Sequence, residues 1–512
     1  MKKFTLIFIL FLFFQFGKAQ TEFITVWKPD GINPNFVTSV TGQNPSTSSQ
    51  IWFPGIGTNY TIQWEEINYP QHHGTLTNVT SIGQTLISFG AHLNPNPNQA
   101  TYRVKVSNGN GVFNQIKFAN LTGTQALPLW TYAGNADKLL AIEQWGNIQW
   151  QSMQNAFSYC RYVQITATDS PNLSSVEDAS YMFYNANSLT GHASMANWNT
   201  SNIKDFRNMF SHISLFQIPD TFNAPISSWN TSNATNFRYM FENRIAFNQN
   251  LNSWDTSEVT DMGYMFSGTQ EFNQPLNNWD TSNVTDMMLM FHYNPNFNQP
   301  LNNWNISKVT NISHMFHGCT AFNQPLNSWN TSAVTNFSTI FVSASSFNQS
   351  LETWNLPALT NGYVAFTGSG LDCDNYSDTL TGWADNPNTA NNINLGPVFL
   401  TYSVDIIPKR NILLSKGWII SNDTVGECRK LSTHESQLKN TSSIYPNPAE
   451  NFIYLKNIKD AKSYIITDMS GRMITKDALT KDFINIQRLK SGNYILQIIS
   501  KEKIETFKFI KK

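Results

Sequence analysis

Apolar and polar positions recur through the middle of the chain with a fixed period of 25 residues. Tryptophan marks the period at Trp229, Trp254, Trp279, Trp304, Trp329 and Trp354, and Trp198 lies one longer interval earlier. A full unit reads W-D-T-S-x-V-T-D-M-x-x-M-F-x-x-x-x-x-F-N-Q-P-L-N-x. A fixed period of roughly 20 to 50 residues is typical of stacked repeats, in which each unit covers the apolar face of its neighbour. The pattern therefore predicts a solenoid.

Two segments of each unit carry their own periodicity. V-T-D-M-x-x-M-F spaces its apolar residues as a helix does, and a Thr-Ser pair precedes it where it can cap the first N–H groups. We predict a short helical turn there. F-N-Q-P-L alternates apolar and polar residues, which predicts a short strand and, after stacking, a parallel sheet along one face. The asparagine of the F-N-Q triplet is expected to form a ladder that bonds backbone groups at each bend; its copies are Asn248, Asn273, Asn298, Asn323 and Asn348.

The repeats extend from about residue 136 to 370, and other patterns flank them. Short alternating runs broken by turn residues predict a small antiparallel β domain over 21–135, loosely immunoglobulin-like. Residues 371–428 lose the period but stay apolar, which predicts a C-terminal cap on the stack. Residues 429–443 are polar and predict a linker, and strand-like runs over 444–512 predict a second small β-sandwich.

One repeat carries a six-residue insertion around Ile213 to Thr221. Insertions in solenoids form loops on one face, which is often the binding face. The alternative is a tolerated surface loop.

The first 20 residues predict a secretory signal peptide. Two lysines precede an apolar run from Phe4 to Phe14, and small residues follow near Ala19. No later stretch reaches the ~18 apolar residues of a membrane-spanning helix, so no transmembrane span is expected. We expect an exported protein.

Charge divides the chain near Cys428. Residues 429–512 hold 16 of the 33 basic and 8 of the 34 acidic residues, a balance of +8 against −9 for the remainder. The lysines of the basic part are spread through strand-like runs rather than clustered, so we expect no nucleic-acid partner.

Four cysteines in an exported chain favour disulfide pairing. Cys160 and Cys319 each follow a repeat phenylalanine by three residues and lie six units apart. At roughly 4.8 Å per unit this separation exceeds disulfide reach, so both are interpreted as small buried residues. Cys373 and Cys428 flank the cap, and we predict that they form a disulfide.

The polar residues of the repeat do not form a catalytic pattern. Asp and Asn interchange at the same positions, as in Asp255 and Asn305, which suits caps and turns but not a catalytic acid. His314 and His317, with His292 one unit earlier, lack the further ligands that zinc requires. We therefore expect no enzyme, no cofactor and no metal site.

The tryptophan column is interpreted as core, with a sugar-stacking platform as the alternative. Variable positions are better candidates for specificity. Tyr264, Leu289, His314 and Thr339 occupy one position in successive units, and we predict that they lie on a ligand-binding face.

The repeat unit resembles the leucine-rich-repeat-like surface proteins of bacteria known as the BspA-like family, over roughly residues 136–428. That resemblance implies secretion and a solenoid that binds molecules of a host, a matrix or a neighbouring cell. It gives a fold class that is mainly β with short helices, a leucine-rich-repeat-like parallel solenoid flanked by two small β-sandwich domains.

The tail resembles the C-terminal sorting domain of type-nine secretion in Bacteroidetes. The matching pieces begin at Tyr445-Pro446-Asn447-Pro448, Asp468-Met469-Ser470-Gly471 and Leu489-Lys490-Ser491-Gly492, and end at Phe507-Lys508-Phe509-Ile510. The resemblance implies interaction with the secretion machinery, followed by removal of the domain.

Three hypotheses follow from the sequence. The first is a non-enzymatic surface or secreted protein that binds an extracellular protein or glycan. The second is a carbohydrate-binding accessory protein that uses the Trp, Asn and Gln columns. The third is an enzyme housed in the N-terminal domain or the cap.

Overall fold

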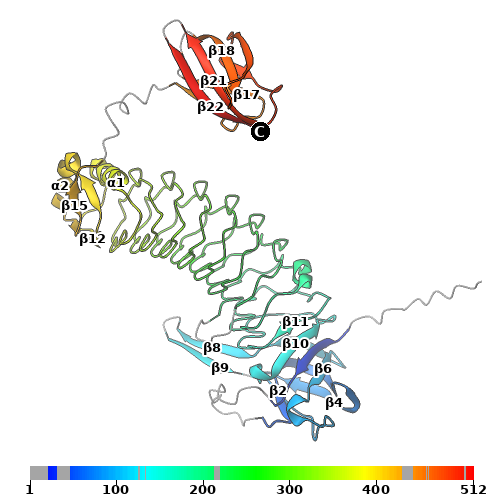
Figure 1. The fold of residues 1–512 in the computed structure, drawn as a ribbon. Coiled ribbons are helices and arrows are strands. Elements are labelled where there is room, and N and C mark those ends of the chain that lie inside the picture. Colours follow the sequence, from blue (N-terminus) through cyan, green and yellow to red (C-terminus); the bar gives the residue numbers. More distant parts are fainter. Residues whose placement is uncertain are drawn as a thin grey trace, which may run out of the picture. The chain divides into compact units, whose positions relative to one another are not determined.

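The computed structural model describes residues 21–30, 46–124, 127–132, 134–212, 220–428, 442–456, 458, 461–500 and 503–512. The predicted signal peptide, most of the insertion and most of the linker lie outside these residues. Contacts divide the chain into two compact units, Met1–Cys428 and Arg429–Lys512. The fold is mainly β with few short helices, and its strands form several separate sheets (Figure 1). No helix in the described part of the chain is long and apolar enough to cross a bilayer.

A seven-stranded sheet forms the N-terminal part of the first unit, in the order β11-β10-β1-β6-β3-β4 with β7 also paired to β3. Its strands are β1 (Phe23–Trp27), β3 (Gly55–Glu66), β4 (Tyr69–Ser81), β6 (Tyr102–Ser107), β7 (Val112–Ile116), β10 (Leu139–Gln144) and β11 (Gln164–Ile165). Two ribbons accompany it, β2 (Gln50–Phe53) with β5 (Thr85–Ser88), and β8 (Ala119–Thr124) with β9 (Leu127–Tyr132). Short 3-10 turns are η2 (Pro97–Gln99), η3 (Ala136–Lys138) and η4 (Ala193–Asn197).

This sheet continues into the repeats. β1 pairs antiparallel with β10, and β10 pairs parallel with β11, which already lies among the repeats. One apolar core runs from Phe23 to Ile420. The sequence predicts a small β domain over 21–135. In the structure its sheet packs on the first coil, where Phe23 contacts Trp150 and Phe157, so these residues share one core with the repeats.

Each repeat forms one coil, and the coils stack in register. Isolated parallel bridges join the Asp or Asn before the Met-x-x-Met segment of successive coils; they are Asp178↔Asp205, Asp205↔Asn236, Asn236↔Asp261, Asp261↔Asp286, Asp286↔Asn311, Asn311↔Asn336 and Asn336↔Asn361. Inside the stack the rings of Phe241, Phe266, Phe291 and Phe316 lie parallel, with centroids 5.7 to 5.9 Å apart. The predicted 25-residue register is therefore present.

The local structure within a coil differs from both predictions. The Met-x-x-Met-Phe segment forms neither a helix nor a strand. The N–H groups of Met265 and Ser267 donate to the carbonyls three residues earlier, while those of Tyr264 and Phe266 donate to the next coil at 2.8 and 2.9 Å. The F-N-Q-P-L segment is an extended loop without ladder pairing. The predicted parallel sheet at F-N-Q-P-L is therefore wrong: in the described repeats from Asn172 onward, the one bridge per coil lies at the Asp or Asn before the Met-x-x-Met segment.

Hydrogen bonds between coils satisfy the polar groups at the bends. The Oδ1 of Asn298 accepts the N–H of Asn323 at 3.0 Å and the Nε2 of Gln324 at 2.9 Å. The same ladder links Asn248, Asn273, Asn298, Asn323 and Asn348 and ends on the N–H of Asp372. The indole N–H of each tryptophan from Trp229 to Trp354 donates to a carbonyl of the preceding coil, as in Trp279 to Leu251 at 2.9 Å.

The cap belongs to the same stack. Its elements are α1 (Cys373–Asp385), β12 (Asn394–Pro397), β13 (Thr401–Ser403), η5 (Val404–Ile406), α2 (Ile407–Ser415), β14 (Ile419–Ser421) and β15 (Thr424–Gly426), with β12 paired to β14 and β13 to β15. Trp383 and Trp418 keep the indole bond of the repeats. A disulfide joins Cys373 to Cys428, whose Cα atoms lie 5.4 Å apart, and Cys160 and Cys319 are free and buried.

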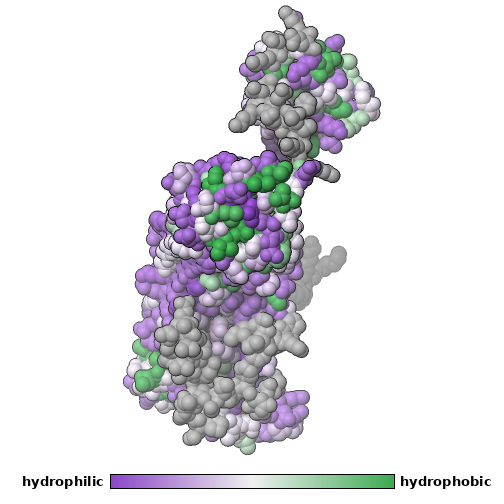
Figure 2. All heavy atoms as spheres, turned by 90° about the vertical axis from the view of Figure 1, so that its left-hand side faces the viewer, coloured by the Kyte–Doolittle hydropathy of each residue, from purple (hydrophilic) through white to green (hydrophobic). Residues whose placement is uncertain are grey.

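The cap does not hide all of its own apolar surface. Figure 2 shows apolar side chains gathered over this end of the stack. Phe399, Val404, Ile419 and Val425 are each about half exposed, at 62%, 49%, 56% and 51%.

The second unit is a small β-sandwich. One sheet contains β16 (Ser443–Tyr445), β17 (Phe452–Lys456) and β20 (Phe483–Asn485), and the other contains β18 (Ala461–Asp468), β19 (Met473–Ala478), β21 (Gly492–Ser500) and β22 (Ile504–Lys511). Its own core includes Ile453, Ile466, Leu496 and Phe509. The unit therefore has an apolar core made of its own residues.

Candidate functional site

The residue two positions before each core phenylalanine has a left-handed backbone. Tyr264, Leu289, His314 and Thr339, the four predicted ligand-face residues, have φ of 61°, 54°, 58° and 56°. The full left-handed column, as we name this position, is Asn155, Tyr181, Asn208, Tyr239, Tyr264, Leu289, His314, Thr339 and Val364. The structure thus aligns the predicted residues in one column.

Coil-to-coil hydrogen bonds impose this conformation. The N–H groups of Leu289, His314 and Thr339 each donate to a carbonyl of the next coil at 2.9 Å. A left-handed φ is rare outside glycine, and for the β-branched Thr339 and Val364 it is a strained state that costs on the order of 1 kcal/mol or more. The same kind of bond recurs from coil to coil, so the column keeps one backbone conformation. Tyr264, His314 and Thr339 are partly exposed, whereas Leu289 is buried and is not presented on the predicted ligand-binding face as the other three are.

Arg238 lies near the middle of the column, beside Tyr239 and Tyr264. Its Nη1 lies 3.2 Å from Asp261 Oδ1 and 2.8 Å from Asp286 Oδ2, so one guanidinium spans two coils. It also lies 5.0 and 5.2 Å from the ring centroids of Tyr239 and Tyr264, which stack at 4.2 Å. Gly263 leaves the room for this arrangement, because a Cβ there would meet Arg238 Nη1 at 2.5 Å.

Glu242 lies beside this cluster. Its Oε2 accepts a hydrogen bond from Ser211 Oγ at 2.9 Å. Burial raises the pKa of Glu242 to about 7, against the opposing effects of the Ser211 bond and of Arg238. The cluster therefore contains a carboxyl group that changes charge near neutral pH.

Three histidines and a tyrosine lie further along the stack. The ring centroid of His292 is 4.9 Å from that of His317 and 6.3 Å from that of His314, and Tyr293 lies 5.1 Å from His317. Burial, together with the neighbouring histidines, lowers the pKa of His292 to about 4, so its ring is neutral at pH 7. Within the described ranges, no three His, Cys, Asp or Glu side chains converge to hold a metal ion.

We call this surface the tyrosine–histidine face. It comprises Tyr159, Tyr181, Tyr184, Arg207, Arg238, Tyr239, Glu242, Tyr264, Leu289, His292, Tyr293, His314, His317, Thr339 and Tyr363. It holds seven of the eight tyrosines between residues 151 and 370, and only Tyr162 lies at another repeat position. The tryptophans, in contrast, are core residues: Trp229, Trp254, Trp279 and Trp304 are only 2 to 3% exposed. The sugar-stacking alternative for the tryptophan column does not fit this burial.

The sequence predicts the left-handed column as a ligand-binding position, but it does not identify the residues that lie beside the column. Arg238 lies one position before Tyr239 of the left-handed column, Glu242 lies three positions after Tyr239, and Tyr293 lies four positions after Leu289. The available signal was that each departs from the residues that other coils carry at its position, for example Gly263 and Ser313 where this coil has Arg238. Of these three residues, only Tyr293 has a positive φ, 51°. The predicted helical turn gave no reason to place any of them beside the column.

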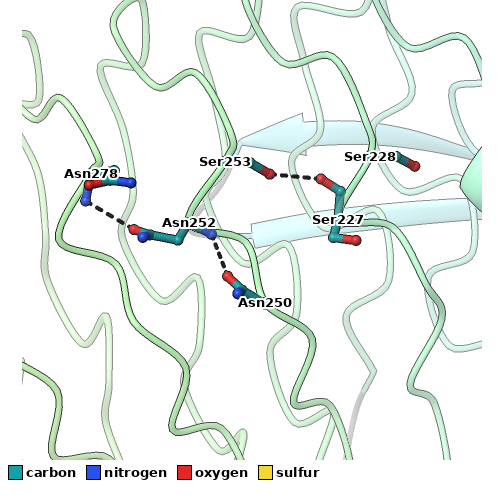
Figure 3. Close-up of a pocket in the computed structure, with 6 residues that line it drawn as sticks. All are labelled: Ser227, Ser228, Asn250, Asn252, Ser253 and Asn278. Carbon is teal, nitrogen blue, oxygen red and sulfur yellow. Dashed lines mark hydrogen bonds between the residues drawn. The ribbon is translucent and has the colours of Figure 1, made fainter.

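A second surface feature lies at the bend before the tryptophans. Ser227, Ser228, Asn250, Asn252, Ser253 and Asn278 line a shallow depression of about 460 Å³ (Figure 3). All six residues carry uncharged amide or hydroxyl groups. Its position differs from that of the tyrosine–histidine face, whose residues lie around the core phenylalanine of each repeat.

Comparisons with known families support the two-part organisation. Residues 151–275, 213–292 and 269–383 match a family model described as Mycoplasma protein of unknown function, DUF285. Residues 443–512 match the model of the secretion system C-terminal sorting domain. The two matches together support a surface protein of Bacteroidetes. No curated protein matches the chain.

The sorting-domain match indicates how the protein is exported. It indicates export to the cell surface or the extracellular space by type-nine secretion, and so an interaction of the second unit with that machinery.

Proposed function

We propose that this chain is a non-enzymatic binding protein of the cell surface or extracellular space, and that its tyrosine–histidine face contacts an extracellular protein. The repeats would then form a leucine-rich-repeat-type solenoid of the BspA-like kind. The observation that carries the proposal is the sorting of aromatic residues, since tryptophan and phenylalanine fill the core while tyrosine gathers on one face.

The composition of the face supports a protein ligand. Tyrosine and arginine are enriched at protein interfaces, because each combines a large contact area with hydrogen-bonding groups. Arg238 is held by Asp261 and Asp286 before any partner arrives. Such preorganisation reduces the entropy lost on binding.

Regularity of the scaffold supports the same conclusion. The left-handed column carries Asn, Tyr, Leu, His, Thr and Val on one repeated backbone. Because the backbone does not depend on the side chain, this column can vary without loss of the fold, as a specificity-determining surface requires.

Binding assays with matched variants test the proposal. The full exported chain is used as bait against extracellular proteins, and the ligand is then titrated against Tyr264→Asn and His314→Asn. Asparagine is the residue that Asn155 and Asn208 already place in the same column, so the fold should persist. We expect at least a tenfold loss of affinity in either variant.

Asn302→Ala and Asn327→Ala, at exposed positions of another side of the coil, serve as controls and should bind as the parent does. Equal binding by the column variants and the controls contradicts the proposal. A glycan that binds the face in place of a protein would favour the carbohydrate-binding alternative.

A further inference from the structure

The depression at the bend before the tryptophans has the chemistry of a small binding site. Its volume of about 460 Å³ lies within the range of roughly 300 to 1,000 Å³ that small-ligand sites occupy. Ser227 and Ser228 come from one coil, Asn250, Asn252 and Ser253 from the next, and Asn278 from a third. The site therefore depends on the stacking of the coils.

Backbone hydrogen bonds orient two of its carboxamides. The N–H of Asn252 donates to Asn250 Oδ1 at 3.0 Å, and the N–H of Asn278 donates to Asn252 Oδ1 at 2.9 Å (Figure 3). A backbone N–H is only a donor, so the carboxamide atom that faces it must be the oxygen. The Nδ2 groups of Asn250 and Asn252 consequently remain as donors with no partner among the residues that the structure describes.

The serines are oriented in a similar way. Ser253 Oγ donates to the carbonyl of Ser227 at 2.9 Å, and Ser228 Oγ donates to the carbonyl of Ala196 at 2.6 Å. A hydroxyl group that donates one hydrogen bond can still accept others through the lone pairs of its oxygen. The depression therefore offers fixed donors beside fixed acceptors within a few ångströms.

A ligand that alternates hydroxyl donors and oxygen acceptors matches this array. None of the six lining residues is charged, and residues 1–428 carry a net charge of −9. An anionic ligand would find no cation in the lining to offset its desolvation. Neutral sugars supply both hydrogen-bonding roles without a charge.

The site is formed where one residue departs from the repeat. Asn250 stands where later coils carry Pro275, Pro300 and Pro325. Proline has no carboxamide and would remove one of the oriented donors.

We propose that the depression lined by Ser227, Ser228, Asn250, Asn252, Ser253 and Asn278 binds a neutral carbohydrate. This site is separate from the tyrosine–histidine face and does not require the protein ligand proposed above.

The chain offers a matched pair of variants to test this site. Asn250→Pro restores the residue of three later coils, and the N–H of Asn250 has no partner among the described residues that proline would remove. Ser350→Pro makes the same restoration four coils further on, outside the depression. Equal unfolding midpoints for the parent and both variants establish that the fold is intact.

The probes are oligosaccharides of β-1,3-glucan, β-1,4-xylan, β-1,4-mannan and β-1,4-galactan, with an oligogalacturonate as the charged probe, titrated calorimetrically into the full chain. We expect at least one neutral probe to bind with a dissociation constant below about 1 mM. Asn250→Pro should weaken that binding at least tenfold, while Ser350→Pro and Tyr264→Asn leave it unchanged.

Three results overturn the proposal. They are no binding by any of the four neutral probes, equal binding by Asn250→Pro and the parent, and preferred binding of the charged probe. Loss of binding in Tyr264→Asn instead of Asn250→Pro would place the sugar on the tyrosine–histidine face and so also overturn it. Because the protein-ligand assay uses a different variant, each proposal can fail without the other.

Discussion

At the scale of single residues, the coil after the insertion contains a fully buried ion pair. Arg244 takes the position that later coils give to Thr269, Asn294, Cys319 and Ala344. Its Nη1 lies 2.9 Å from Asp220 Oδ1, and its Nη2 donates to the carbonyl of Ala186 at 3.2 Å. Asp220, at the end of the insertion, is thereby fixed to the core.

Replacement of Arg244 by methionine should destabilise the first unit strongly. It leaves the buried Asp220 carboxylate without a cation beside it, which costs roughly 3 to 5 kcal/mol. The double variant Arg244→Met with Asp220→Asn should recover a large part of that loss, and Thr269→Ala should cost only about 1 kcal/mol. Urea unfolding followed by tryptophan fluorescence measures the differences. A single variant as stable as the parent would show that the pair does not hold the insertion.

Glu242 should make the stability of the stack depend on pH. Its folded-state pKa of about 7 lies above the ordinary value of 4.5, so between these values the folded chain binds one more proton than the unfolded chain. Stability therefore falls as the pH rises through this window. Glu242→Gln cannot ionise and should gain on the order of 2 kcal/mol relative to the parent between pH 5 and pH 8.5. Unfolding curves at both pH values test this, and a pH-independent difference contradicts it.

At the scale of elements, the coil replaces ordinary secondary structure with bonds between neighbours. The N–H groups of Met262, Tyr264, Phe266 and Gly268 donate to the next coil, while the intervening residues close turns of three residues. Left-handed residues stand four positions apart in this segment, at Tyr264 and Gly268. An isolated coil has no partner for half of these groups, so the conformation exists only in a stack.

The asparagine ladder joins neighbouring coils at the F-N-Q segment. Breaking one of its bonds should lower the stability of the stack. Asn298→Ala removes the acceptor of the Asn323 N–H and of Gln324, which should cost roughly 1 to 3 kcal/mol. Asn298→Asp keeps an acceptor and should cost less. Asn303→Ala, an exposed residue of the same coil, should change stability by less than about 0.5 kcal/mol. The denaturant midpoints of the three variants measure these differences in stability. Equal midpoints for Asn298→Ala and Asn303→Ala would contradict a stabilising role of the ladder.

At the scale of the whole molecule, the chain combines a repeat stack with a separate export unit. The two units have cores made of different residues. The basic charge of residues 429–512 sets the second unit apart from the acidic first unit.

Deletion of residues 429–512 should stop the protein in the periplasm without changing the unfolding midpoint of the first unit. Cell fractionation and thermal unfolding of the truncated chain measure the two effects. The mature surface form should end within residues 429–443, which intact-mass measurement tests. Surface protein that retains Lys512, or a truncated chain that still reaches the surface, would mean that the tail is a second binding module instead.

The sequence by itself determined the register, the core and the organisation of this protein. Tryptophan and phenylalanine at a 25-residue period specify which side chains meet in the next coil, because stacking depends on spacing alone. The break in charge and composition near Cys428 coincides with the boundary between the two units. Composition can be read directly from the sequence, without knowledge of the fold.

The backbone of each coil was decided only by the tertiary structure. V-T-D-M-x-x-M-F has helical spacing, yet its N–H groups find carbonyls about 24 residues away, as Tyr264 does with Met288. Those bonds hold Thr339 and Val364 in a left-handed state that local preference disfavours. The tyrosine–histidine face and the depression at Asn250 follow from the same stacking, since each joins residues of several coils that no single repeat brings together.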